Sequence, residues 1–175
     1  MNKKKIIISV LVGVLIISTS IAAVAGGYLS AEKKSGNFSS KILDRVSFEI
    51  DNTVQEFSLA NLNDGQCIFQ AELTAQKNEA DFYAMINSIT ASGFDFSSVV
   101  VTPLQKFSEV CEPNGGVMPA KDGKAIPVGW DIKIYFTPNK KGTINGSIEV
   151  DYTSGAKKNV ANRQILQIPI QIVVS

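Results

Sequence analysis

The residue types that carry out most protein chemistry are sparse in this chain. The 175 residues include no histidine, which excludes the usual general base, the usual zinc ligand and any serine–histidine or cysteine–histidine pair. The aspartates and glutamates are scattered and form no calcium-loop motif, and Gly115-Gly116 belongs to no phosphate-binding motif. The sequence therefore predicts no catalytic residue, no metal site and no cofactor, and we expect the protein not to be an enzyme.

The two cysteines, Cys67 and Cys111, are the residues most able to form a specific bond. In a protein that leaves the cytoplasm, an even pair of cysteines favours a disulfide. The bond would close a loop of about 45 residues and would stabilise the fold by about 3–4 kcal/mol on the chain-entropy account. The alternative is two unpaired thiols, one buried and one in a loop.

The first 25 residues have the three parts of a secretory signal. Three lysines at positions 3–5 precede an apolar run from Ile6 to Ala25, which ends in Ala23-Val24-Ala25. A basic start, an apolar middle and a small-x-small exit predict export, with cleavage between Ala25 and Gly26. The 20-residue run is also long enough to span a bilayer, so an uncleaved signal anchor is the alternative. In both cases we expect an extracellular or cell-surface protein.

Cleavage would leave 150 residues, which is enough for one domain with a substantial core. This part carries 14 basic and 16 acidic residues. A nearly neutral domain without a basic stripe gives no electrostatic reason to bind nucleic acid or an anionic membrane surface. We therefore expect no nucleic-acid partner, and contact with a membrane only through the N-terminal run if that run is not cleaved.

Most of the chain after residue 42 alternates apolar and polar residues, as half-buried strands do. The clearest predicted strands are Val46–Ile50, Phe57–Leu59, Cys67–Thr74, Phe96–Val101, Trp130–Phe136, Ile144–Val150 and Ile165–Val174. In these strands Cys67 faces inward and Trp130 is a core residue, while Asp51-Asn52 is a predicted turn. The stretch from Phe82 to Thr90 fits either a helix or a strand, and we favour a strand. Pro169 predicts an edge strand or a bulge.

The composition divides the chain into three parts. Residues 1–25 are the signal peptide or signal anchor, and residues 26–41 are a polar, flexible or extended lead-in. The folded domain is expected over residues 42–175, with residues 103–128 as a long connection. Short alternating strands without a sustained amphipathic helix predict an all-β fold. We expect an Ig-like or jelly-roll antiparallel β-sandwich, preceded by an N-terminal signal or transmembrane helix.

The front half of the chain resembles the camelysin/TasA family of exported fibre and matrix proteins, found mainly in Gram-positive bacteria. The resemblance covers roughly residues 20–93 and consists of four pieces in order. These are the signal exit Ala25–Ser30, the Asn-x-Phe segment Ser35–Leu43, the turn Phe57–Gly65 and the strand–turn–strand stretch Leu73–Ile89.

The resemblance implies an exported β-sandwich whose subunits join into extracellular fibres. In such fibres the extended N-terminal segment of one subunit can complete the sheet of the next. Here that segment would be Gly26–Ser40, with Tyr28, Leu29 and Phe38 as the candidate donor-strand residues. Strand addition is physically plausible because an open sheet edge has unpaired N–H and C=O groups.

We therefore expect a bacterial structural protein of a surface fibre or biofilm matrix that assembles by β-strand addition. Its partner would be another copy of itself or another surface or matrix protein. The alternative is a membrane-anchored surface binding or adhesion module with an Ig-like domain, which would use the connection at residues 103–128.

Overall fold

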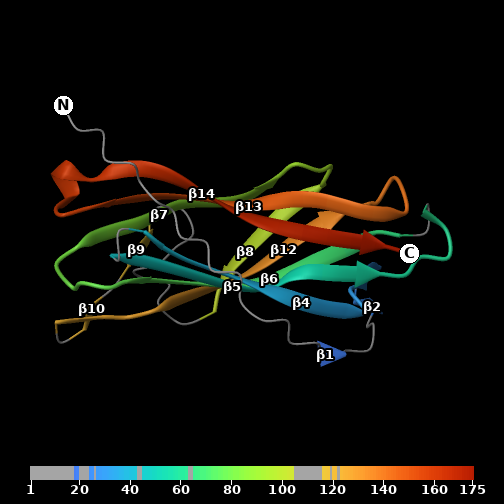
Figure 1. The fold of residues 1–175 in the computed structure, drawn as a ribbon, viewed down its shortest axis with the longest axis horizontal. Coiled ribbons are helices and arrows are strands. Elements are labelled where there is room, and N and C mark those ends of the chain that lie inside the picture. The colour runs from blue at the N-terminus through green and yellow to red at the C-terminus, as the bar shows by residue number, and fades with distance from the viewer. Residues whose placement is uncertain are drawn as a thin grey trace.

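The structure is a computed structural model. It describes residues 18–19, 24–25, 27–42, 45–62, 65–104, 116–118, 120–121 and 123–175. Most of these residues lie in strands and none of them forms an α-helix, which confirms the all-β prediction (Figure 1). The long strands are β4 (Lys33–Ile42), β5 (Val46–Phe57), β6 (Cys67–Lys77), β7 (Tyr83–Ser92), β8 (Ser98–Pro103), β12 (Val128–Phe136), β13 (Gly142–Gly155) and β14 (Asn162–Val174). The short ones are β1 (Ser18–Thr19), β2 (Val24–Ala25), β3 (Tyr28–Ser30), β9 (Gly116–Val117), β10 (Ala120–Lys121) and β11 (Lys124–Ala125), and a 3-10 turn, η2 (Lys158–Val160), precedes β14.

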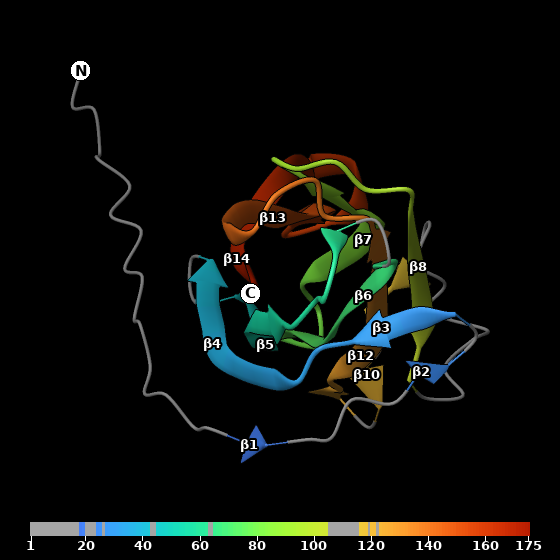
Figure 2. The same ribbon diagram turned by 90° about the vertical axis from the view of Figure 1, so that its right-hand side faces the viewer.

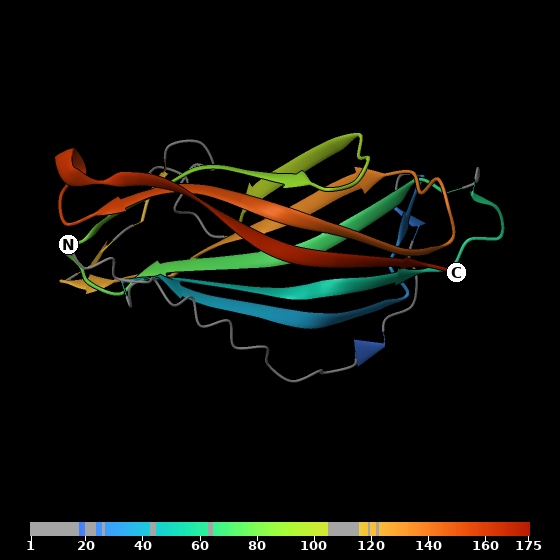
Figure 3. The same cartoon turned by 45° about the horizontal axis from the view of Figure 1, so that its top comes forward.

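One continuous sheet curls around the core and forms a near-barrel (Figure 2). Its main order is β2-β3-β6-β5-β14-β13-β7-β9, with β12 and then β8 beyond β6, and with β4 beside β5. Strands β6 and β12 run obliquely to β13 and β14 (Figure 3). The predicted purely antiparallel sandwich is therefore wrong in two respects. The two halves of the sheet are joined, and the pairs β14–β5 and β3–β6 are parallel.

Strand β5 joins the two halves of the sheet. Its first five residues pair with β6, and its last four pair with β14. Between these two parts, Asn52 has a left-handed φ of 55° and lies near Gly36 of β4, whose φ is 80°. The β4–β5 register shifts here, as it does at a β-bulge, and a bulge bends a strand and increases its twist. The prediction of a turn at Asp51-Asn52 is therefore wrong, and these residues form the bulge. Asparagine tolerates the left-handed conformation in turns and in bulges, so its presence does not distinguish the two.

The inward side chains form one apolar core, in which the large residues with less than 2% exposure are Trp130, Tyr152, Phe48, Phe57, Phe69, Phe136, Leu73, Ile86, Met118, Ile132, Ile134 and Ile148. The predicted core positions of Trp130 and Cys67 are confirmed. The stretch from Phe82 to Thr90 lies mostly in strand β7, as we favoured. Pro169 lies where β14 has β13 on one side and β5 has not yet joined on the other, which confirms an edge position.

The folded body begins well before residue 42, which corrects the predicted boundary. Strand β4 pairs antiparallel with β5 over nearly its whole length. The polar composition of β4 hides this strand, because its outer edge and one of its faces are open to solvent and need no apolar residues. The expected lead-in at residues 26–41 is therefore extended over its described residues, and most of it belongs to the sheet.

The predicted N-terminal helix is not shown. Ser18–Thr19 and Val24–Ala25, which belong to the apolar run, form the short strands β1 and β2. The rest of residues 1–25 and Gly26, with the predicted cleavage site, lie outside the described residues. In the part of the chain that the structure describes, no helix is long and apolar enough to cross a membrane.

The predicted connection at residues 103–128 contains local structure. Its described residues include strand β9, which pairs with β7, and the hairpin formed by β10 and β11. Residues 105–115 lie outside the described residues.

Candidate functional site

The N-terminal segment, residues 27–42, is the part of the chain on which the sequence and the fold converge. Leu29 and Ser30 of β3 pair in parallel with Cys67 and Ile68 of β6. The ring of Tyr28 lies edge-on to that of Tyr135 on β12, with 4.7 Å between the ring centroids. Two of the three predicted donor residues, Tyr28 and Leu29, therefore contact the sheet of their own chain.

The segment then crosses from β6 to the far side of β5. Ala31 enters the core and is 2% exposed. The backbone N–H of Glu32 donates to the carbonyl of Glu56 over 2.8 Å, and β4 continues along β5 from there. Phe38, the third predicted donor residue, is partly buried against the core. All three candidate residues thus pack against their own chain, Tyr28 and Leu29 on β3 beside β6 and Phe38 on β4 beside β5.

A seam opens between β5 and β6 where these strands diverge. The two strands pair as far as Ile50 and Leu73. Beyond this point the fully buried side chain of Gln55 takes the place of a strand. Its amide nitrogen donates to the carbonyl of Gln70 over 2.5 Å, and its amide oxygen accepts from the N–H of Gln70 over 3.2 Å. One side chain therefore satisfies both backbone groups of a β6 residue.

Charged side chains complete the closure of the seam. A carboxylate oxygen of Asp51 accepts from the backbone N–H of Glu72 over 3.1 Å. Lys34 of β4 lies nearby, and its pKa is lowered because burial disfavours its charged form, while Asp131, Asp51 and Glu72 oppose this shift. The seam is thus a part of the sheet in which β5 and β6 no longer pair with each other. Side chains fill most of its length, and β3 fills one end.

The open strand edges of the described sheet include those of β4 and β8. The outer edge of β4 pairs with β1 at Lys33 and Lys34, and no other described strand lies beside it. The outer edge of β8 has no strand partner among the described residues. Unpaired edges of this kind can pair with another chain, and lysines such as those of β4 disfavour uncontrolled pairing.

Cys67 faces the core beside the N-terminal segment. It is a free thiol in the structure and is fully buried. Its sulfur lies 3.9 Å from the carbonyl oxygen of Gly65 as a weak donor, and burial raises its pKa to about 11. Cys111 lies outside the described residues, so the pairing of the two cysteines stays a prediction.

We expect the purified protein to contain the Cys67–Cys111 bond. The bond removes two hydrogens, so the mass of the intact chain should be about 2 Da below that of the reduced chain. Mass spectrometry before and after reduction measures this difference. A count of two free thiols in the unfolded, unreduced protein would contradict the prediction.

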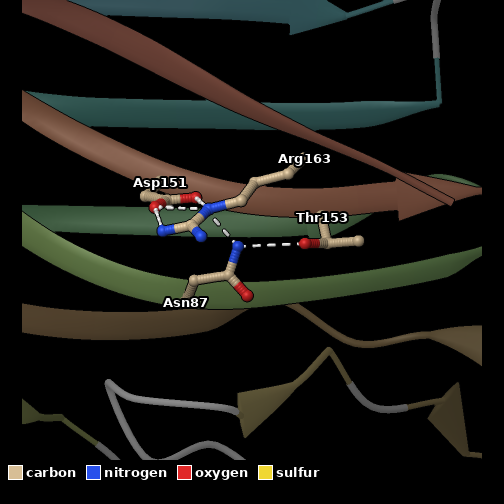
Figure 4. A network of polar contacts seen from close by, with 4 residues as sticks. All are labelled: Asn87, Asp151, Thr153 and Arg163. Atoms are coloured by element: carbon tan, nitrogen blue, oxygen red, sulfur yellow. Dashed lines mark hydrogen bonds and ion pairs between the residues drawn. The ribbon is translucent and has the colours of Figure 1, made fainter.

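A second polar cluster joins strands β7, β13 and β14 (Figure 4). The Nε of Arg163 donates to both carboxylate oxygens of Asp151 at 2.9 Å, and a terminal guanidinium nitrogen of Arg163 also contacts one of them. The amide of Asn87 donates to Asp151 over 2.8 Å and to Thr153 over 2.9 Å. Asn87 is the extra residue where the β7–β13 register shifts. The cluster holds together a bulged part of the sheet and has the geometry of a structural cross-strand network.

We expect Asp151 to make the folding stability depend on pH in the acidic range. The hydrogen bond from Arg163 lowers its pKa, burial opposes this, and Asn87 lowers it further. A carboxyl whose folded-state pKa is depressed stabilises the fold above its ordinary pKa of about 3.9, and this contribution is lost as the pH falls further. Asp151→Asn should therefore lower the melting temperature at pH 7 by a few degrees and have a smaller effect near pH 2.5. An equal loss at both pH values would contradict this account.

The described residues offer little other chemistry. Within them, no three His, Cys, Asp or Glu side chains are placed to hold a metal ion.

Comparisons with known proteins leave the family open. No protein-family model matches the chain, and no curated protein does. Among solved structures, the chain is similar to the CooA pilin subunit from enterotoxigenic Escherichia coli, with a TM-score of 0.35 and 8% sequence identity. The match covers 70% of this chain and 90% of the pilin chain. A TM-score this low does not establish a shared fold.

Proposed function

We propose that the protein is an exported structural protein, a subunit of an extracellular surface fibre or biofilm matrix that assembles by β-strand addition. The exchanged strand is the N-terminal segment, and the partner is a second copy of the chain. The observation that carries this proposal is the seam between β5 and β6, where β3 pairs with two residues of β6 and side chains fill the rest. A strand position in the sheet is thus only partly occupied.

The physical argument rests on the equivalence of cis and trans contacts. The N-terminal segment precedes β5 and all later strands in the chain, so its contacts with β5 and β6 can be made by the segment of a neighbouring copy. Exchange then costs little beyond releasing the segment, because each released contact is formed again in trans. A head-to-tail exchange of this kind produces filaments when the rotation between neighbouring copies does not close a ring.

The secretory signal pattern supports a location outside the cytoplasm. Copies of the protein that accumulate there can exchange strands with one another. The absence of histidine from the whole chain favours a structural role over an enzymatic one. The resemblance of residues 20–93 to exported fibre proteins points to the same role.

Electron microscopy of the purified protein tests the proposal. We expect regular filaments when the protein is concentrated at neutral or mildly acidic pH. Monomers that persist at every concentration under both conditions would contradict the proposal, and would favour the surface-binding module as the function.

A further inference from the structure

Strand β8 has an exposed apolar stripe beside its outer edge, which no strand among the described residues covers. Six large apolar side chains of the described residues are exposed, and three of them lie on this one strip of chain. They are Phe96, Val100 and Leu104, which are 37%, 43% and 45% exposed. The strand between them, Ser98–Pro103, contains no charged residue. Natural edge strands are commonly protected by charges, so an uncharged apolar edge marks an interaction surface.

The backbone of β8 shows which groups point outward. The N–H of Leu104 donates to the carbonyl of Gly129 on β12 over 2.9 Å. Because hydrogen bonding alternates along an antiparallel strand, Thr102 and Val100 also turn their backbone groups toward β12. Val99 and Val101 then turn theirs toward the open side.

The stripe is symmetric in sequence. Phe96 and Leu104 lie four residues before and four residues after Val100. In an antiparallel pair of two identical strands with Val100 opposite Val100, Phe96 of each copy lies beside Leu104 of the other. The same register places Val99 opposite Val101, so that these two residues exchange backbone hydrogen bonds in both directions.

The ends of this ladder leave no donor unpaired. Pro103, which has no N–H, falls opposite Ser97. The N–H of Ser97 already donates to the carbonyl of Tyr135 over 2.7 Å. The register that brings the apolar side chains together therefore also pairs the outward-facing backbone N–H and C=O groups of the two strands.

We propose that β8 is a self-association edge, at which two copies of this chain pair antiparallel about a two-fold axis at Val100. A second copy fits this edge because the stripe is complementary to itself and because no like charges meet across the axis. The edge of β4, with Lys33, Lys34 and Lys41, does not have this property. The pairing does not use the N-terminal segment, so it is independent of strand exchange.

Charge substitution at Val100 tests the pairing, because the two Val100 side chains meet at the axis. Sedimentation equilibrium of the unpolymerised fraction should show dimers for the unchanged protein. Val100→Lys alone and Val100→Glu alone should each weaken the dimer by roughly tenfold or more, since like charges oppose each other across the strands. An equal mixture of the two variants should restore the dimer.

The matched control is Val160→Lys. Val160 is 58% exposed and lies in η2, away from β8, so this variant should stay dimeric. Far-ultraviolet circular dichroism should show that each variant keeps its fold. A monomeric unchanged protein, a dimer that persists in Val100→Lys, or a mixture that does not re-form the dimer would each overturn the proposal.

Discussion

A chain shortened to begin at Leu43 is expected to lose most of its folding stability, and a separate peptide of residues 28–42 is expected to restore it. The truncation removes β3 and β4, the buried Ala31 and the partly buried Phe38. The lost burial and strand hydrogen bonds amount to roughly 5 kcal/mol, which is comparable to the whole stability of many small domains. Urea denaturation with and without the peptide measures both effects.

A peptide with Gly36→Ala provides the matched control for this experiment. Gly36 has a φ of 80°, and a Cβ atom there would lie 2.5 Å from the hydroxyl of Thr53. This peptide should restore much less stability than the unchanged one. If the shortened chain were fully stable without any peptide, the N-terminal segment would not be part of the sheet, and strand exchange through it would have no energetic basis.

Gln55→Leu is expected to destabilise the protein by about 2–4 kcal/mol, because it removes the partner of both backbone groups of Gln70, which are part-buried. Leucine has a similar volume, so the loss reports on the hydrogen bonds to Gln70 more than on packing. The free energy of unfolding measured with urea gives the size of the effect. A change below about 0.5 kcal/mol would mean that water or a shifted strand replaces the side chain.

Gln167→Leu is the control for the second experiment. Gln167 is exposed on β14, and its amide nitrogen donates to a carboxylate oxygen of Glu149 over 3.3 Å. The same chemical change at this position should alter stability by less than about 0.5 kcal/mol. The difference between the two variants isolates the contribution of the seam.

Strands that alternate sharply could be predicted from the sequence, because one face of each is buried. The strand from Trp130 to Phe136 and the inward position of Cys67 were found in this way. Strand β4 was not found as part of the folded body, because an edge strand with one solvated face needs few apolar residues. The bulge at Asn52 was mistaken for a turn, since asparagine serves both.

The seam could not be predicted, because it depends on where two strands diverge. Gln55 lies between Val54 and Glu56, and a single glutamine in such a stretch is typical of a solvated face. The pairing of Asp151 with Arg163 was missed for a related reason. Charged residues on neighbouring strands meet only when the register is known, and register does not follow from composition. The donor residues Tyr28, Leu29 and Phe38 came from a resemblance, and the structure places all three against the sheet of their own chain.

Covalent trapping of the N-terminal segment in assembled polymers tests the central claim most directly. Leu29 and Cys67 are register partners in neighbouring strands, about 4.8 Å apart in a standard sheet, which is within the Cα separation of disulfides. In the double variant Leu29→Cys, Cys111→Ser, oxidation should therefore link these two positions. Strand exchange predicts a ladder of covalent multimers when polymers are oxidised and run on a non-reducing gel. Polymers that yield only a cross-linked monomer, about 2 Da lighter than the reduced chain, would show that the segment stays on its own sheet and would contradict the account.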